Sequence, residues 1–127
     1  MKKYRRAMQI VSVLLLALSA WYVSPVLSAG DPEVAKQAWP MIDQGALLID
    51  VRTHEEFTDG HIAGAINIPW EKTDELMAVI GPDKQRQVVV YCRSGNRSGK
   101  AMVDLQNKGY SGIFNATGYH ALKETKP

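Results

Sequence analysis

Short continuous apolar runs alternate along this chain with segments that carry helix signals. An apolar run of four or five residues without polar alternation is typical of a strand that is buried on both faces. Strands are predicted at 46–49, 65–69, 87–91 and 113–115. Helices are predicted at 31–44, 53–59, 71–80 and 98–108. This alternation predicts an α/β domain with a small, mostly parallel central sheet flanked by helices on both faces.

Two of the predicted helices carry clear start signals. Asp31 precedes Pro32, and a capping aspartate followed by proline at the first helical position is typical of a helix N-terminus. Thr53 and Glu56 have the spacing of a capping box, in which each side chain bonds to the other residue's backbone N–H. Pro40 lies inside the first predicted helix, and because proline removes a backbone donor we expect a bend or an interruption there.

Length and charge limit the classes of function. A chain of 127 residues is enough for one compact domain. Four of the 15 Lys and Arg residues lie in the first six positions, and residues 1–28 contain none of the 13 acidic residues. Residues 29–127 therefore have 11 basic and 13 acidic side chains, a net charge of −2. No basic face remains, so we expect no nucleic acid as a partner.

Residues 1–28 are predicted to be a signal peptide. A basic start precedes an apolar run over 7–23, and small residues follow the run, with cleavage expected after Ser28 or Ala29. An uncleaved membrane anchor is the alternative, which the run supports less well because a spanning helix needs about 20 apolar residues. In both cases the basic start stays in the cytoplasm, and the domain of residues 29–127 is expected in the periplasm. It is attached to the membrane only if the leader is retained.

Cys92, the one cysteine of the chain, lies at the end of a valine-rich run. A lone cysteine in an exported protein cannot form an internal disulfide, so its thiol is inert and buried, paired to another chain, or reactive. The residues behind it favour the third reading. Gly95 and Asn96 can take the backbone angles that turn successive N–H groups into an anion-binding nest, and a helix follows. Such a nest, with arginines beside it, favours thiolate over thiol.

Four segments resemble the signatures of the rhodanese family in their order and spacing. They are LLIDVR at 47–52, Glu56, GHIAGAINIP at 60–69 and VYCRSGNRS at 90–98. The resemblance extends over nearly all of residues 29–127 and implies a rhodanese-like domain there. It also implies a thiosulfate sulfurtransferase. In such an enzyme the Cys92 thiolate takes the outer sulfur of thiosulfate, releases sulfite and passes the persulfide sulfur to cyanide or a thiol. No cofactor is implied, and a monomer is expected.

Two comparisons within the wider family refine this reading. The related cysteine phosphatases carry five residues between cysteine and arginine, whereas four separate Cys92 from Arg97. The shorter loop suits an added sulfur atom better than a tetrahedral phosphate, which argues against phosphatase or arsenate reductase activity. The family often ends in a glycine pair and a tryptophan-bearing helix, whereas this chain has ATGYH at 116–120. How a last helix covers the site is therefore left open.

The loop and the resemblance together give the candidate site residues. Cys92 is the predicted nucleophile. The predicted substrate-binding residues are Arg93, Ser94, Gly95, Asn96 and Arg97, and the predicted supporting residues are Asp50, Arg52 and Ser98. We expect Asp50 to bridge an arginine or a loop amide rather than to act as a catalytic acid. Arg52 and Glu56 are interpreted as scaffold.

Other chemistries receive less support from the sequence. The three histidines, at 54, 61 and 120, lack the spacing of a metal site, so no metal ion is expected. A persulfide carrier or an oxyanion-binding module without turnover is the main alternative to an enzyme. A redox sensor is a weaker alternative, because the sequence offers no resolving cysteine.

Overall fold

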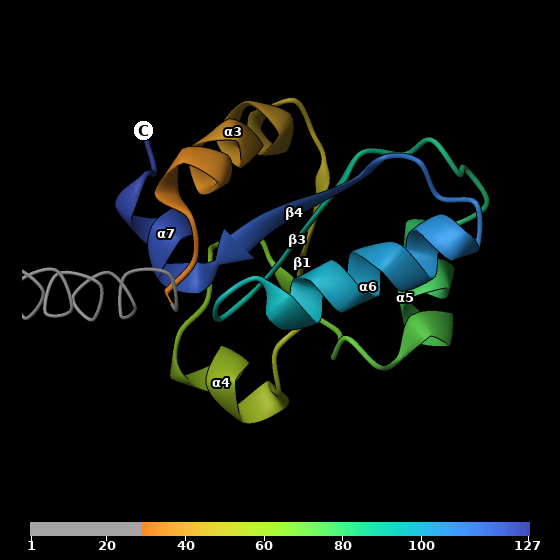
Figure 1. The fold of residues 1–127 in the computed structure, drawn as a ribbon, viewed down its shortest axis with the longest axis horizontal. Coiled ribbons are helices and arrows are strands. Elements are labelled where there is room, and N and C mark those ends of the chain that lie inside the picture. The colour runs from red at the N-terminus through yellow and green to blue at the C-terminus, as the bar shows by residue number, and fades with distance from the viewer. Residues whose placement is uncertain (1–28) are drawn as a thin grey trace, which may run out of the picture.

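A computed structural model describes residues 29–127 of the protein. Four strands form one parallel sheet in the order β2, β1, β3, β4 (Figure 1). The strands are β1 Leu47–Asp50, β2 Ile66–Asn67, β3 Val88–Cys92 and β4 Ile113–Gly118. The helices are α3 Pro32–Asp43, α4 His54–Asp59, α5 Thr73–Ile80, α6 Asn96–Asn107 and α7 Tyr119–Glu124. The predicted α/β fold is confirmed, whereas the predicted signal peptide lies outside the described residues.

Helices cover both faces of the sheet, so the molecule has two apolar cores (Figure 1). Successive side chains of a strand point to opposite faces. Val88, Val90 and Cys92 of β3 therefore pack toward α5 and α6, while Val89 and Tyr91 pack toward α3 and α7. All five residues are fully buried, which explains why β3 is a continuous apolar run in the sequence. Because the strands are parallel, their carboxyl ends lie at one edge of the sheet.

Of the bend or interruption predicted at Pro40, the interruption is wrong, because α3 continues through this residue to Asp43. Proline removes only one donor, and its position in the last third of the helix limits the loss. Ala38 and Trp39 are buried against the sheet and α7, and the Gln44 N–H donates to the Pro40 carbonyl at 3.1 Å. Packing therefore holds the last turn in place. No helix within residues 29–127 is long and apolar enough to cross a membrane.

Two element boundaries beside the cysteine differ from the prediction. Cys92 is the last residue of β3, and α6 begins at Asn96, two residues earlier than predicted. Gly95 is the N-cap of α6 with φ 104°, so only three residues, 93–95, connect the strand to the helix. The capping box that starts α4 at Thr53 and Glu56 is confirmed.

The C-terminal part of the chain differs most from the prediction. β4 continues to Gly118, three residues beyond the predicted strand, and α7 follows it directly. Thr117 has φ 70°, a left-handed conformation that costs a β-branched residue energy. The Thr117 hydroxyl offsets part of this cost, because its oxygen accepts a hydrogen bond from the Asp31 N–H at 2.8 Å.

We predict that Gly118→Ala destabilises the domain by roughly 1–3 kcal/mol, because a Cβ atom at this position would overlap the carbonyl oxygens of Ala29 and Arg93. Gly118 has φ −120°, so any loss reports the overlap and not the backbone angle. Gly99→Ala is the matched comparison, since Gly99 also lacks a positive φ and the nearest atom to the added carbon, Asn115 Nδ2, lies at an ordinary contact distance of 3.4 Å. Urea unfolding of both variants measures the difference, and equal losses would contradict the prediction.

Candidate active site

The sulfur of Cys92 lies at the carboxyl end of β3, on the sheet face that α6 covers. The backbone of Cys92 pairs with Gly118 of β4, past a register shift that follows Val90. Its exposed fraction is 0%, so the thiol is shielded from bulk water. An ion in this position depends on protein groups for its solvation.

Donors of the loop point at this buried sulfur. The Gly95 N–H donates to Cys92 Sγ at 3.0 Å, and the Ser98 hydroxyl oxygen lies 3.3 Å from the sulfur. Burial alone raises the pKa of the Cys92 thiol, but hydrogen bonds from Ser98 and from the Ser94 and Gly95 backbones outweigh burial and lower the pKa below its ordinary value. Glycine suits position 95, because φ is 104° there and a Cβ would lie 3.1 Å from Thr117 Cβ. The loop is built to hold an ionised sulfur.

Asn115 of β4 is a residue of the site that the sequence analysis missed. Its Nδ2 donates to the Gly95 carbonyl at 3.0 Å, and its Oδ1 accepts from the Ser98 hydroxyl at 2.7 Å and from the Thr117 N–H at 3.0 Å. One side chain therefore ties the cysteine loop, the first turn of α6 and the end of β4 together. A polar residue near the carboxyl end of an otherwise apolar strand was the signal available in the sequence.

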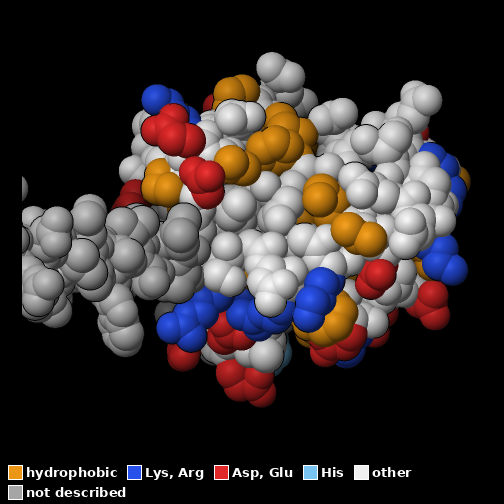
Figure 2. Space-filling model, viewed as in Figure 1, with side chains coloured by type: hydrophobic (Ala, Val, Ile, Leu, Met, Phe, Trp, Pro, Cys, Tyr) orange, Lys and Arg blue, Asp and Glu red, His pale blue; other side chains and the backbone are white. Residues whose placement is uncertain are grey.

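Arg97 does not extend freely toward the sulfur. Its guanidinium makes two parallel hydrogen bonds to the Glu56 carboxylate of α4, at 2.6 and 3.0 Å. The side chains are 27% and 31% exposed, so the pair lies at the rim of the site. The Arg97 guanidinium lowers the pKa of Glu56 from 4.5 to about 2. On the face shown in Figure 2, basic and acidic side chains alternate between the start of α6 and α4. Glu56, interpreted from the sequence as scaffold, is thus the partner of a candidate site residue.

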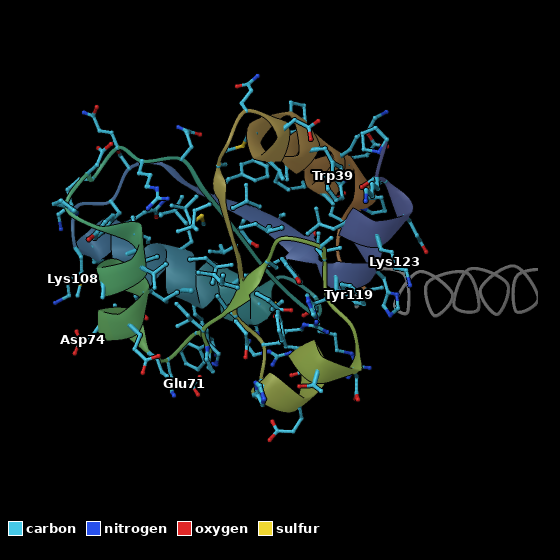
Figure 3. All side chains as sticks on the ribbon, turned by 180° about the vertical axis from the view of Figure 1, so that it is seen from behind. Trp39, Glu71, Asp74, Lys108, Tyr119 and Lys123 are labelled. Atoms are coloured by element: carbon cyan, nitrogen blue, oxygen red, sulfur yellow. The ribbon has the colours of Figure 1, made fainter. Side chains whose placement is uncertain are left out.

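Asp50 and Arg52 form the second ion pair near the site. Arg52 Nη2 lies 2.7 Å from Asp50 Oδ2 and donates to the Gly60 carbonyl at 2.6 Å. Both side chains are buried, and the Arg52 guanidinium lies over the Tyr119 ring, 4.7 Å from its centroid. Figure 3 labels Tyr119 at the start of α7, on the side where α4 lies. Asp50 is thus paired with an arginine, the arrangement expected from the sequence, and the pair fixes the end of β1.

Of the other predicted substrate-binding residues, Ser94 and Gly95 are half-buried, whereas Arg93 and Asn96 are exposed. Arg93 is exposed and lines a hollow of about 290 Å³, together with side chains of α4, Arg52 and the start of α7. Asn96 lines a different cleft, of about 570 Å³, together with other side chains of α6. Trp70 and Lys100 also line this cleft, and Lys100 Nζ lies over the Trp70 ring, 5.1 Å from its centre. The cysteine loop therefore contributes residues to two hollows.

The histidines have structural contacts of their own. His61 Nδ1 lies 2.8 Å from the Phe57 carbonyl oxygen, and the His61 ring stacks on the Phe57 ring at 3.7 Å. Within residues 29–127, no group of three or more His, Cys, Asp or Glu side chains is arranged to hold a metal ion.

Fold and site define a class of protein: a small parallel α/β domain whose buried cysteine ends a central strand and accepts hydrogen bonds from the following loop. Comparison with known families agrees with this description. The family described as "Rhodanese-like domain" matches residues 34–124, and the chain belongs to this family.

Individual relatives support the same assignment. The chain is 38% identical over 104 residues to the protein named thiosulfate sulfurtransferase PspE of Escherichia coli K12, which covers 82% of this chain and 85% of that protein. It is 38% identical over 84 residues to thiosulfate sulfurtransferase 16 of Arabidopsis thaliana, a chloroplast protein, across 58% of this chain and 70% of the relative.

Solved structures resemble the fold as well. A structure described as rhodanese with anions from E. coli has a TM-score of 0.56 and 40% identity, and the match covers 61% of this chain and 91% of that one. The human single-domain sulfurtransferase TSTD1 has a TM-score of 0.58 and 28% identity, with 68% of this chain and 88% of that chain covered.

We predict that Glu56→Gln lowers the free energy of unfolding by about 1–2 kcal/mol at pH 7, a value reduced by the partial exposure of the ion pair. The pKa of Glu56 is depressed in the folded state, so the stabilisation is fully present above pH 4.5 and is lost as the pH falls toward about 2. The difference between variant and wild type should therefore shrink over this range.

Urea unfolding at a series of pH values tests this prediction. Glu55→Gln is the matched control, because Glu55 is an exposed carboxylate on the same helix with no ion pair among the described residues. A stability difference for Glu56→Gln that stays constant from pH 7 to pH 2.5 would contradict the assigned role of the pair.

Proposed function

We propose that this protein is a thiosulfate sulfurtransferase that works through a persulfide on Cys92. One observation carries the proposal: a cysteine sulfur with a lowered pKa lies under backbone and hydroxyl donors at the carboxyl end of the sheet. A thiolate is the reactive form of cysteine, and a nest of donors also attracts anionic substrates. Membership of the rhodanese-like family, and relatives named thiosulfate sulfurtransferases, support the same chemistry.

In the first step, the Cys92 thiolate attacks the outer sulfur of thiosulfate. A bond forms between Cys92 Sγ and that sulfur, while the S–S bond of thiosulfate breaks and its electron pair leaves with sulfite. The negative charge then lies on the terminal sulfur of the persulfide. The backbone N–H donors of the loop can stabilise this charge too, and the Gly95 N–H, 3.0 Å from Sγ, is the nearest of them.

In the second step, cyanide or a thiolate acceptor attacks the terminal sulfur. The persulfide bond breaks, and its electron pair returns to Cys92 as thiolate. Because the Cys92 residue is fully buried, loop side chains must move aside before either reactant reaches the sulfur. Arg93 is suited to attract thiosulfate, since it is exposed at the mouth of the 290 Å³ hollow.

A second candidate function is a persulfide carrier or an oxyanion-binding module without turnover of its own. The same donors around the sulfur would bind sulfite or thiosulfate in such a protein. The proposal also keeps the periplasmic location and the monomeric state expected from the sequence. The location depends on the predicted leader in residues 1–28, which precede the described residues.

The purified protein, given thiosulfate and cyanide, should release thiocyanate, and Cys92→Ala should release none. Mass spectrometry after thiosulfate alone should show one added sulfur atom on Cys92. Cys92→Ser is the matched control for binding, because it keeps the shape of the loop. Thiosulfate binding that persists in Cys92→Ser, with wild-type thiocyanate production at background, would favour the carrier or binding module over the enzyme.

A separate prediction concerns Arg97. If its guanidinium assists thiosulfate binding, Arg97→Ala should lower kcat/KM about 10- to 100-fold. Arg97→Lys should recover only part of the loss, because lysine keeps the charge but not the planar fork. Glu56→Gln should not weaken thiosulfate binding, since it leaves the Arg97 charge without its carboxylate partner. Steady-state kinetics measure all three, and unchanged constants in Arg97→Ala would show that backbone donors bind the substrate without it.

A further inference from the structure

The orientation of the Asn115 amide is fixed by its partners. The Thr117 N–H can only donate, so the Asn115 atom 3.0 Å from it must be the oxygen. The Gly95 carbonyl can only accept, so the atom 3.0 Å from it must be the nitrogen. Both contacts give the same assignment, and neither allows a flipped amide. The Asn115 atom that lies 2.7 Å from Ser98 Oγ is therefore an oxygen without a hydrogen.

The Ser98 hydroxyl then has two acceptors and one hydrogen. At 2.7 Å from Asn115 Oδ1, the serine must supply the hydrogen of that bond. The same oxygen lies 3.3 Å from Cys92 Sγ, within hydrogen-bond distance of a sulfur. One hydroxyl donates one hydrogen bond, so it cannot serve Asn115 and a thiolate at the same time. Ser98 is fully buried, so water does not resolve this competition.

We propose that the Ser98 hydroxyl alternates between two acceptors and that Asn115 is the positioning residue that sets when it turns toward the sulfur. With a Cys92 thiol, the S–H donates to Ser98 Oγ and Ser98 donates to Asn115. With a thiolate, the hydroxyl rotates to donate to Sγ, and Asn115 Oδ1 keeps only the Thr117 N–H. The inference rests on the proposed function only in assigning these states to a sulfur-transfer cycle.

The rotation follows the charge on the sulfur. On ionisation the thiol proton leaves to solvent, while the Ser98 proton stays on its oxygen and changes only its direction. In a persulfide, Sγ is bonded to carbon and to sulfur and carries no formal charge, so the hydroxyl returns to Asn115. Asn115 therefore opposes formation of the thiolate and favours the persulfide. A thiolate that is held less tightly by donors has a higher pKa and is the stronger nucleophile.

Charged side chains around the sulfur do not take part in the competition for the Ser98 hydrogen. Arg97 on α6 is paired with Glu56 on α4, and Asp50 at the end of β1 is paired with Arg52. The remaining charged side chain of the loop, Arg93, is exposed to solvent. None of these side chains makes a hydrogen bond to Ser98 or Asn115 within the described residues. The competition therefore involves the buried Cys92 and Ser98 side chains and the half-buried Asn115 side chain.

A double-mutant cycle on Cys92 alkylation tests the proposal. The chain has one cysteine, so iodoacetamide reacts with a single thiol, and the assay needs no sulfurtransferase activity. Asn115→Ala removes the competing acceptor. Below the midpoint of the alkylation profile, its rate should be roughly three- to tenfold above wild type, because Ser98 then donates freely to the thiolate. Above the midpoint the plateau rate should fall, since a more stable thiolate is less nucleophilic.

The Ser98→Ala background separates competition from loop disorder. There Asn115→Ala removes the bond to the Gly95 carbonyl but no competition for a hydroxyl, so the gain in alkylation rate should disappear. Asn115→Asp is the second variant, used also if Asn115→Ala does not fold, because it keeps the acceptor for Ser98 and Thr117. Asn115→Asp should raise the pH midpoint of Cys92 alkylation. The increase should be larger when Ser98 is present than in the Ser98→Ala background. Equal effects of each Asn115 substitution in both backgrounds would overturn the proposal.

An NMR measurement on the unmutated protein provides an independent readout. The Thr117 N–H shares Asn115 Oδ1 with Ser98, so its chemical shift should change with the same midpoint as Cys92 ionisation. After conversion to the persulfide with thiosulfate, the Thr117 signal should return toward its position in the thiol form. A Thr117 amide that does not follow Cys92 ionisation would show that Ser98 keeps one acceptor throughout. Failure to form a persulfide would contradict the proposed function. The pH dependence of the Thr117 signal would then still test the competition for the Ser98 hydrogen.

Discussion

A buried sulfur that must carry a charge needs donors inside the protein, and this requirement organises the carboxyl edge of the sheet. Burial raises the pKa of Cys92, and hydrogen bonds from Ser98 and the loop backbone lower it. The donors come from a three-residue connection and the first turn of α6. Those segments are held in turn by Asn115 and by the close contact of Gly95 with Thr117. Strand β4, which contains Asn115 and Thr117, therefore supports the site as well as completing the sheet.

Charge near the site is arranged in pairs. Arg97 forms an ion pair with Glu56, and Arg52 forms one with Asp50, so each of these two arginines is paired with a carboxylate. The partly exposed pair contributes modestly to stability, whereas breaking the buried pair would leave an uncompensated charge. Arg93 is the arginine of the loop that is exposed and has no ion pair among the described residues. In the proposed function, different groups would therefore attract an anion at the surface and stabilise charge at the sulfur.

Local patterns in the sequence predicted the fold. The apolar runs predicted all four strands, and Thr53 and Glu56 predicted the start of α4, because both signals depend on near neighbours. The path through Pro40 depends on packing against distant residues, which local rules do not include. The roles of Asn115 and Glu56 depend on contacts across 17 or more positions. Only the parallel sheet and its crossing helices bring those partners to Ser98 and Arg97.

The reliance on main-chain donors has a consequence for the genetics of this site. Ser94 and Gly95 act on the sulfur through N–H groups that every residue except proline possesses. Sequence variation at the side chain of Ser94 leaves its main-chain donor in place, so an alanine scan records little of its contribution. The positions of these N–H donors depend on the backbone conformation, namely on the left-handed φ of Gly95 and on its close contact with Thr117. These donors depend on chain geometry, and in the sequence only glycine at position 95 and the absence of proline from the loop reflect it.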